Sequence, residues 1–160
     1  MNTYSRDGVA PACLRLQDRL GADVNIVMYC CWLAHDRGVL FDRSAVNQVE
    51  SIVGTWKSTV VEPLRLIRRA LKGTVHDGFD AGEQEHLRTE IKRLELRSER
   101  LQQDALFATT PPRTEKSASA DERRNKARAN VDLYLETLLR SGEDADYGDA
   151  QLIVNAAFDN

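Results

Sequence analysis

Four polar-tipped side chains within and beside a strongly apolar segment, residues 26–34, are the first candidates for chemistry. Asn25, Tyr29, Trp32 and Asp36 are spaced four, three and four residues apart, so a helix would place them on one face. Each of these side chains needs a hydrogen-bonding partner if it is buried. The row therefore predicts either a small pocket between helices or a set of polar groups that neighbouring residues satisfy.

Cys31 and His35 are a candidate pair for metal binding or nucleophilic catalysis, because a spacing of four residues can place both on one metal ion. A metal site needs further ligands, and the sequence contains no CxxC or HExxH motif and no acidic cluster at ligand spacing. Nothing in the sequence supplies an orienting group for a Cys–His nucleophile. We therefore predict no metal, no cofactor and no catalytic residue.

A basic stripe is the second candidate for a binding site. Arg65, Arg68, Arg69 and Lys72 fall at helical positions i, i+3, i+4 and i+7. Arginine forks suit carboxylates and phosphates, so this face predicts an acidic protein partner or a phosphate-bearing ligand. The competing interpretation is a solvated stripe, or one neutralised within the chain by glutamates of a later segment, namely Glu83, Glu85, Glu90 or Glu95.

Composition narrows the classes of partner. A net charge of −3 and an aromatic content of 6% disfavour nucleic acid. No window approaches the ~20 apolar residues that a membrane span requires. The first residues lack a basic region followed by an apolar one, and the three cysteines are an odd number. We therefore expect no secretory signal, no membrane segment and a reducing, cytoplasmic location.

Capping and turn residues divide the N-terminal half into helices. Asp7 is predicted to cap a first helix that ends at Gly21, and Asp23 to cap a second helix over 24–37 that ends at Gly38. The second helix is apolar almost all round, which is typical of a helix surrounded by others. We expect this helix to build the scaffold and to carry no chemistry.

Three more helices are predicted before residue 108. One starts at Ser44 or Asp42 and runs to about Trp56, and the next runs over 58–72 and ends at Gly73. Pro63 must lie in the first turn of that helix or kink a longer one, because proline has no N–H to donate. A long charged helix over 83–107 carries a thin heptad-like seam, and the sequence leaves open whether this helix packs within the chain or between chains. The seam residues are Leu87, Ile91, Leu94 and Leu101.

The remaining residues predict a linker and a helical pair. Residues 108–120 are rich in proline and small polar residues, and helices are predicted over 121–140 and 147–160. The apolar residues of this pair need a surface to cover. The predicted fold class is therefore all-α. Domain 1–107 is a bundle of about four helices plus the long charged helix, 108–120 is a linker, and the helical pair in 121–160 docks on the bundle.

Residues 4–72 resemble a known family through four motifs. These are Y-x-R-x-G-V, then C-L-x-L-Q-D, then D-V-N ahead of an apolar run containing Trp, and finally V-x-P-L-R-x-x-R. The string resembles a set of small helical proteobacterial proteins filed as a domain of unknown function. The resemblance implies an uncharacterised cytoplasmic bacterial protein and supplies no activity. The matching residues are Tyr4, Arg6, Gly8, Val9, Cys13, Leu14, Leu16, Gln17, Asp18, Asp23, Val24, Asn25, Trp32, Val61, Pro63, Leu64, Arg65 and Arg68.

Two hypotheses about function remain at this point. The first is a non-enzymatic interaction or regulatory module that binds an acidic protein through Arg65, Arg68, Arg69 and Lys72. The alternative is a helical domain, enzymatic or not, that binds a small molecule or a phosphate-bearing ligand. Its pocket would be lined by Asn25, Tyr29, Trp32 and Asp36, which would meet Arg65 or Arg68.

Overall fold

The protein is described by a computed structural model over residues 3–112, 119–139 and 147–159, and all regular structure in these residues is helical. The all-α prediction is confirmed. By its internal contacts the chain forms two compact units, Met1–Glu50 with Thr109–Asn160, and Ser51–Ala108. The elements are η1 (Thr3–Ser5), α1 (Val9–Leu20), α2 (Val24–Trp32), η2 (Leu33–Arg37), α3 (Arg43–Trp56), η3 (Lys57–Val61), α4 (Glu62–Ala70), α5 (Ala81–Ala108), α6 (Ala120–Leu138) and α7 (Gly148–Phe158).

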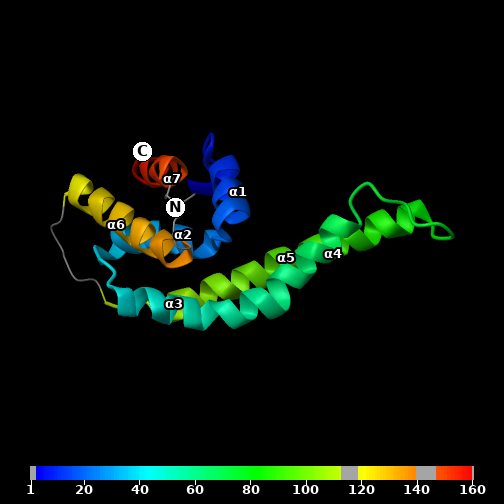
Figure 1. Cartoon of the computed structure of the whole chain (residues 1–160), viewed down its shortest axis with the longest axis horizontal. Helices are drawn as coiled ribbons and strands as arrows, with labels where there is room; N and C mark the ends of the chain where they lie inside the picture. The colour runs from blue at the N-terminus through cyan, green and yellow to red at the C-terminus, as the bar shows by residue number, and fades with distance from the viewer. Residues whose placement is uncertain (1–2, 113–118, 140–146, 160) are drawn as a thin grey trace. The chain divides into compact units, whose positions relative to one another are not determined.

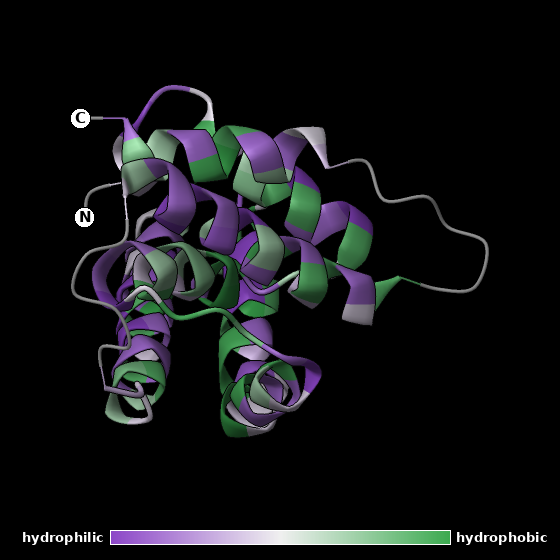
Figure 2. Cartoon of the chain, turned by 90° about the vertical axis from the view of Figure 1, so that its left-hand side faces the viewer, coloured by the Kyte–Doolittle hydropathy of each residue, from purple (hydrophilic) through white to green (hydrophobic). Residues whose placement is uncertain are grey.

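The first unit is built around α2. This helix contacts α1, α6 and α7, while α7 also packs along α1 and α6 (Figure 1). Hydrophobic and hydrophilic stretches alternate along several of the helices drawn in Figure 2, which is typical of helices with one buried face. The prediction that the apolar segment is enclosed is confirmed for most of its side chains, whereas Met28 and Trp32 are only half-buried. The buried side chains are Ile26, Val27, Cys30, Cys31, Leu33 and Ala34.

The predicted helix ends in this unit are largely confirmed. Gly21 and Gly38 each have a φ of 67°, the left-handed conformation that glycine adopts at low cost after a helix. The Asp23 carboxylate accepts a hydrogen bond of 2.8 Å from the backbone N–H of Asn25, so Asp23 caps α2 as predicted. The second predicted helix has its expected extent, although its last turn, η2, is a wider π-turn.

The prediction that Asp7 caps α1 is wrong. Gly8, with a φ of 78°, occupies the N-cap position and no side chain caps the helix. The chain enters α1 through a backbone turn in which the Val9 N–H donates to the Arg6 carbonyl over 3.2 Å. This backbone hydrogen bond satisfies one of the exposed helix donors without the Asp7 carboxylate.

A row of polar side chains on α6 ties this helix to α2 and to the segment that follows it. Asn130 is fully buried, accepts a hydrogen bond from the Phe41 N–H over 2.7 Å and donates to the Val39 carbonyl over 3.1 Å. The Tyr134 hydroxyl accepts from the Asp23 N–H over 2.8 Å. Lys126, one helical turn before Asn130, donates to the Gly38 carbonyl over 2.9 Å. Backbone groups that α2 and its flanking turns leave unpaired are thereby satisfied.

The second unit is a helical hairpin. The third and fourth helices predicted from sequence are one continuous helix, because η3 joins α3 to α4 without a break. The Glu62 N–H donates to the Lys57 carbonyl five residues earlier, so the helix widens by one residue just ahead of Pro63. Pro63 therefore lies inside a longer helix, one of the two placements that its missing N–H allowed.

The long helix α5 runs antiparallel to α4 and packs against it and η3 (Figure 1). The Trp56 indole N–H donates to the Ser98 carbonyl over 3.0 Å. This hydrogen bond helps to fix the register between the two helical arms of the hairpin. No helix in the described part of the chain is both long and apolar enough to cross a membrane. Arg140 and residues 113–118, which the sequence assigns to a helix end and to the linker, lie outside the described residues.

Candidate functional site

The polar row on α2 and η2 is held by its own neighbours. Tyr29 is buried, and its hydroxyl forms a hydrogen bond of 3.1 Å with the Thr110 hydroxyl. Burial raises the pKa of Tyr29 more than its hydrogen bonds to the adjoining threonines lower it. The Trp32 ring stacks on the Tyr29 ring with 6.0 Å between the ring centroids. The Arg37 guanidinium lies over the Trp32 ring, 5.6 Å from its centroid.

The two ends of that row are also accounted for. Asn25 is half-buried beside the Asp23 cap, and Asp36 is exposed and forms an ion pair of 3.1 Å with Arg37. All four row residues belong to the first unit, whereas the four residues of the basic stripe belong to the second. A pocket that combines the two sets stays a prediction.

The cysteines of α2 are chemically protected by burial. Desolvation raises the pKa of Cys31 to about 12, and it raises the pKa of Cys30 well above the usual thiol value. Desolvation also raises the pKa of Cys13, on α1, to about 11. These thiols stay protonated at neutral pH, so the nucleophilic thiolate is scarce. Among the described residues no three His, Cys, Asp or Glu side chains are grouped so that they could hold a metal ion.

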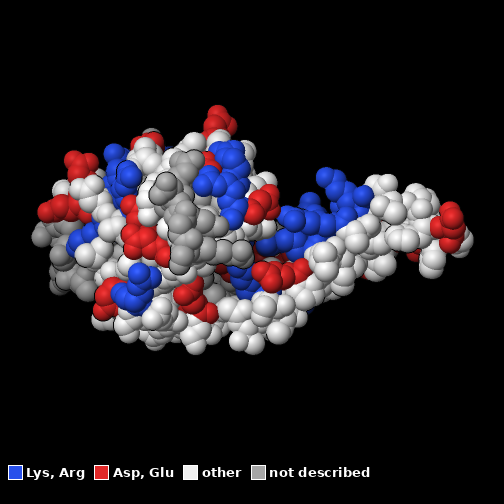
Figure 3. Space-filling model, viewed as in Figure 1, with Lys and Arg blue, Asp and Glu red and all other residues white. Residues whose placement is uncertain are grey.

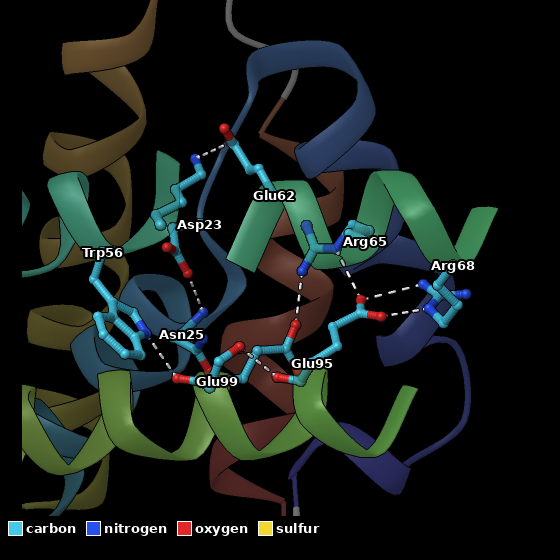
Figure 4. A network of polar contacts seen from close by, with 10 residues as sticks. Asp23, Asn25, Trp56, Glu62, Arg65, Arg68, Glu95 and Glu99 are labelled. Carbon is cyan, nitrogen blue, oxygen red and sulfur yellow. Dashed lines mark hydrogen bonds and ion pairs between the residues drawn. The ribbon is translucent and has the colours of Figure 1, made fainter. Parts of the chain in front are cut away.

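The basic stripe of α4 meets two carboxylates of α5 (Figure 4). Arg65 donates from Nε to Glu95 over 3.2 Å and from Nη2 to Glu99 over 2.7 Å. Arg68 binds both carboxylate oxygens of Glu95, from Nε and, over 3.2 Å, from Nη2. Glu95 was one of the glutamates that the sequence offered for neutralising the stripe, whereas Glu99 was not predicted.

Glu95 is the centre of this cluster. It is only 5% exposed, so burial disfavours its ionised form, but the hydrogen bonds and charges of Arg68 and Arg65 outweigh burial and lower its pKa. A bidentate arginine–carboxylate pair is among the stronger polar contacts in proteins. Half of the predicted binding stripe therefore stabilises the hairpin from within, and the other half, Arg69 and Lys72, is exposed.

The opposite flank of the hairpin is apolar. Leu87, Leu94 and Leu101 are separated by seven residues each and are 48%, 51% and 50% exposed. Ile91, the fourth member of the predicted seam, is buried. In the view of Figure 3 uncharged side chains cover most of the visible face of the hairpin, with basic side chains along one edge. The predicted seam is thus divided between a buried isoleucine and a row of half-exposed leucines.

Helical geometry shows which α4 residue lies beside this row. Ile67 and Leu94 each precede by one residue a member of the Arg68–Glu95 pair, so they lie at the same level of the antiparallel hairpin. A step of one residue rotates about 100° around a helix, which places both on the flank away from the ion pairs. Ile67 is 48% exposed. We call Ile67, Leu87, Leu94 and Leu101 the leucine flank.

Comparison with known protein families assigns the chain to one of them. The family model described as "Protein of unknown function (DUF2390)" matches residues 1–106. The chain belongs to this family. Membership in DUF2390 agrees with the resemblance over residues 4–72 and extends it through nearly the whole of α5. No curated protein and no solved structure matches the chain.

The DUF2390 match covers both the enclosed α2 and the hairpin, so either could carry the family's function. The sequence located the hairpin's basic stripe but not the exposure of the leucines beside it. An available signal was the alternation along α5 of leucines and glutamates one residue apart, Leu94 with Glu95, because only one of two adjacent helical residues can face the same neighbour.

Proposed function

We propose that this protein is a non-enzymatic interaction module. Its first unit is a scaffold built around α2, and its hairpin of α4 and α5 contacts a protein partner. The observation that carries the proposal is the leucine flank, in which three half-exposed leucines at heptad spacing along α5 lie beside Ile67 of α4. Such rows are typical of helices that pack against another helix.

The distribution of side chains on α5 supports an external partner. Glu95 is turned inward and is 5% exposed, while its neighbour Leu94 is turned outward. Burying a charge is costly unless it is paired, and each half-exposed leucine forgoes about half of the roughly 1.5–3 kcal/mol that full burial provides. A hairpin selected only for its own stability would place the leucine inside and the glutamate outside. A partner helix on the leucine flank would recover the burial energy that the hairpin forgoes.

The sequence predicted that four basic residues would bind an acidic partner, but fewer of them are available for such binding. Arg65 and Arg68 already bind Glu95 and Glu99, so a partner's carboxylates would have to compete with these glutamates. Arg69 is exposed near the end of α4 and Lys72 is exposed just after it, and neither belongs to the leucine flank. In this proposal the leucine flank therefore supplies the affinity for the partner.

Photocrosslinking with a matched control tests the proposed function. Leu94 on the leucine flank and Leu96 on the outer face of α5 are 51% and 56% exposed, so an inserted photoreactive phenylalanine is equally accessible at either position. We expect the residue at position 94 to form crosslinked protein adducts in cells that make the chain natively, and the residue at position 96 to form few. Equal adduct formation from both positions, or none from position 94, would refute the proposal.

A further inference from the structure

We infer that the partner on the leucine flank is a second copy of this chain, packed antiparallel about a twofold axis near Leu94. The inference rests on the proposed function and adds the identity of the partner. Twofold packing would place Leu94 against Leu94 of the second copy, and Leu87 against Leu101 of the second copy. Two hairpins would then form a four-helix bundle, with the same surface of each copy facing the other.

The heptad positions of α5 show which pairing is open. With the three leucines at position d, Ile91 and Ser98 take position a and are buried inside the hairpin. The e positions are already used, because Glu95 binds Arg65 and Arg68, and Arg88 binds Glu85. Parallel helices pair g positions with e positions of the neighbour, whereas antiparallel helices pair g with g. Only the g positions of α5 keep charged side chains that a second copy could pair with. Antiparallel packing is the arrangement that brings these g positions together.

The g positions next to the twofold axis are complementary to themselves. Glu90 and Arg97 flank Leu94 on the exposed edge of the row, three or four residues to either side. In the register that superposes Leu94 on its copy, Glu90 lies within one residue of Arg97 of the second copy, and the reverse contact follows by symmetry. Arg97 is exposed, and Glu90 has only a weak contact of 3.7 Å with His86, with most of both side chains exposed. Two identical ion pairs would thus select this register.

The proposed interface widens onto α4. Ile67 lies at the level of Leu94 on the same flank, so it extends the apolar surface across the groove between the two helices. Arg69 follows Arg68 by one residue, so it lies about 100° round α4 on the side away from Ile67, whereas Lys72 lies in the turn after α4. Arg69 therefore does not oppose the approach of a second leucine flank.

A charge exchange tests the register in the purified full-length chain. Sedimentation equilibrium should show a reversible dimer. Glu90→Arg alone, or Arg97→Glu alone, should weaken it about tenfold by placing like charges together at two symmetric positions. The double variant with both changes should restore dimerisation to near the parental level. The matched control exchanges charges on the outer face, Arg93→Glu, and should leave the dimer unchanged. A double variant no tighter than either single variant would overturn the register.

Disulfide trapping tests the twofold axis in a way that does not depend on the charges. The three native cysteines are buried, so a cysteine introduced at the surface is the reactive one. Under mild oxidation Leu94→Cys should form a chain of twice the mass, whereas Leu96→Cys should not. A chain that stays monomeric at hundreds of micromolar and gives no Leu94→Cys dimer overturns the second-copy inference. In that case, position-94 photocrosslinks to a different protein would still uphold the proposed function, and their absence would refute both.

Discussion

Replacing Asn130 by alanine is expected to lower the free energy of unfolding by about 2–5 kcal/mol. The substitution leaves the Phe41 N–H and the Val39 carbonyl without their partner in a fully buried position. Each buried group left unpaired costs about 1–3 kcal/mol. The Cys30 carbonyl, 3.5 Å from Asn130, loses less because it also accepts from the Leu33 N–H. Chemical denaturation followed by circular dichroism measures the change.

Asn125→Ala is the matched control for this prediction. Asn125 lies on the same helix, α6, but is exposed, so the same chemical change should alter stability by no more than about 0.5 kcal/mol. The difference between the two variants isolates the buried hydrogen bonds from any change in helix propensity. If Asn130→Ala unfolds at the same denaturant concentration as Asn125→Ala, the contacts that join α6 to the end of α2 do not hold the first unit together.

Glu95→Gln is expected to destabilise the hairpin by about 2–3 kcal/mol. The substitution removes the negative charge that pairs with Arg65 and Arg68 while keeping the size of the side chain. Breaking a fully buried pair costs about 3–5 kcal/mol, and the value here is lower because both arginines keep about a fifth of their side-chain surface exposed. Amide hydrogen exchange in α4 and α5 measures the loss directly, because the effect is local to this unit.

The decrease in the free energy of unfolding at acid pH gives a second measure of the contribution of Glu95. Its pKa is lowered in the folded chain, so the unfolded chain binds its proton at a higher pH than the folded chain does. The contribution of Glu95 is therefore present in full above the ordinary glutamate pKa of about 4.3 and is lost as the pH falls through the lowered value. Glu95→Gln should flatten this part of the pH profile.

Glu85→Gln is the control for both readouts of Glu95. It removes the charge of Glu85, whose side chain is 57% exposed against 6% for Glu95, from its pair with Arg88 on the same helix. A pair with an exposed carboxylate contributes little to stability, so hydrogen exchange in the hairpin should be almost unchanged. Equal effects of the two substitutions would mean that the Arg65–Glu95–Arg68 cluster does not hold α4 against α5.

The first unit could be predicted from its sequence because local signals and burial agree there. The Asp23 side chain, Gly21 and Gly38 fix the ends of helices whatever surrounds them. A helix such as α2, which is apolar on nearly every side, is stable in water only when other helices enclose it. Asp7 was misassigned because a backbone turn competes with a side-chain cap for the same N–H groups, and the sequence does not show which one wins.

The hairpin could be predicted only in part. Pro63 indicates a helix start, yet the π-turn η3 accommodates it inside a longer helix, and sequence periodicity does not register a single inserted residue. The positions of Arg65, Arg68 and Glu95 were evident, but their pairing depends on the register between α4 and α5. That register is set by long-range packing, including the Trp56–Ser98 hydrogen bond.

The heptad spacing predicted that Leu87, Leu94 and Leu101 share one side of α5 and left open what covers them. Spacing shows that three leucines share one side of a helix, but it does not show which other helix covers them. Asn130 was missed for a related reason, because an asparagine within a charged helix has the same local pattern whether it is solvated or buried.

The most direct test of the account is the stability of a chain whose Leu87, Leu94 and Leu101 are all changed to glutamine, measured at a protein concentration low enough to keep every chain monomeric. Because about half of each leucine side chain already faces water, the account predicts only a small acceleration of hydrogen exchange in α5 relative to the parental chain. Ile91→Gln, which changes the buried member of the same seam, should accelerate exchange strongly. Equal acceleration in the two variants would contradict the account, because the leucines would then belong to the core of the hairpin and not to an interface.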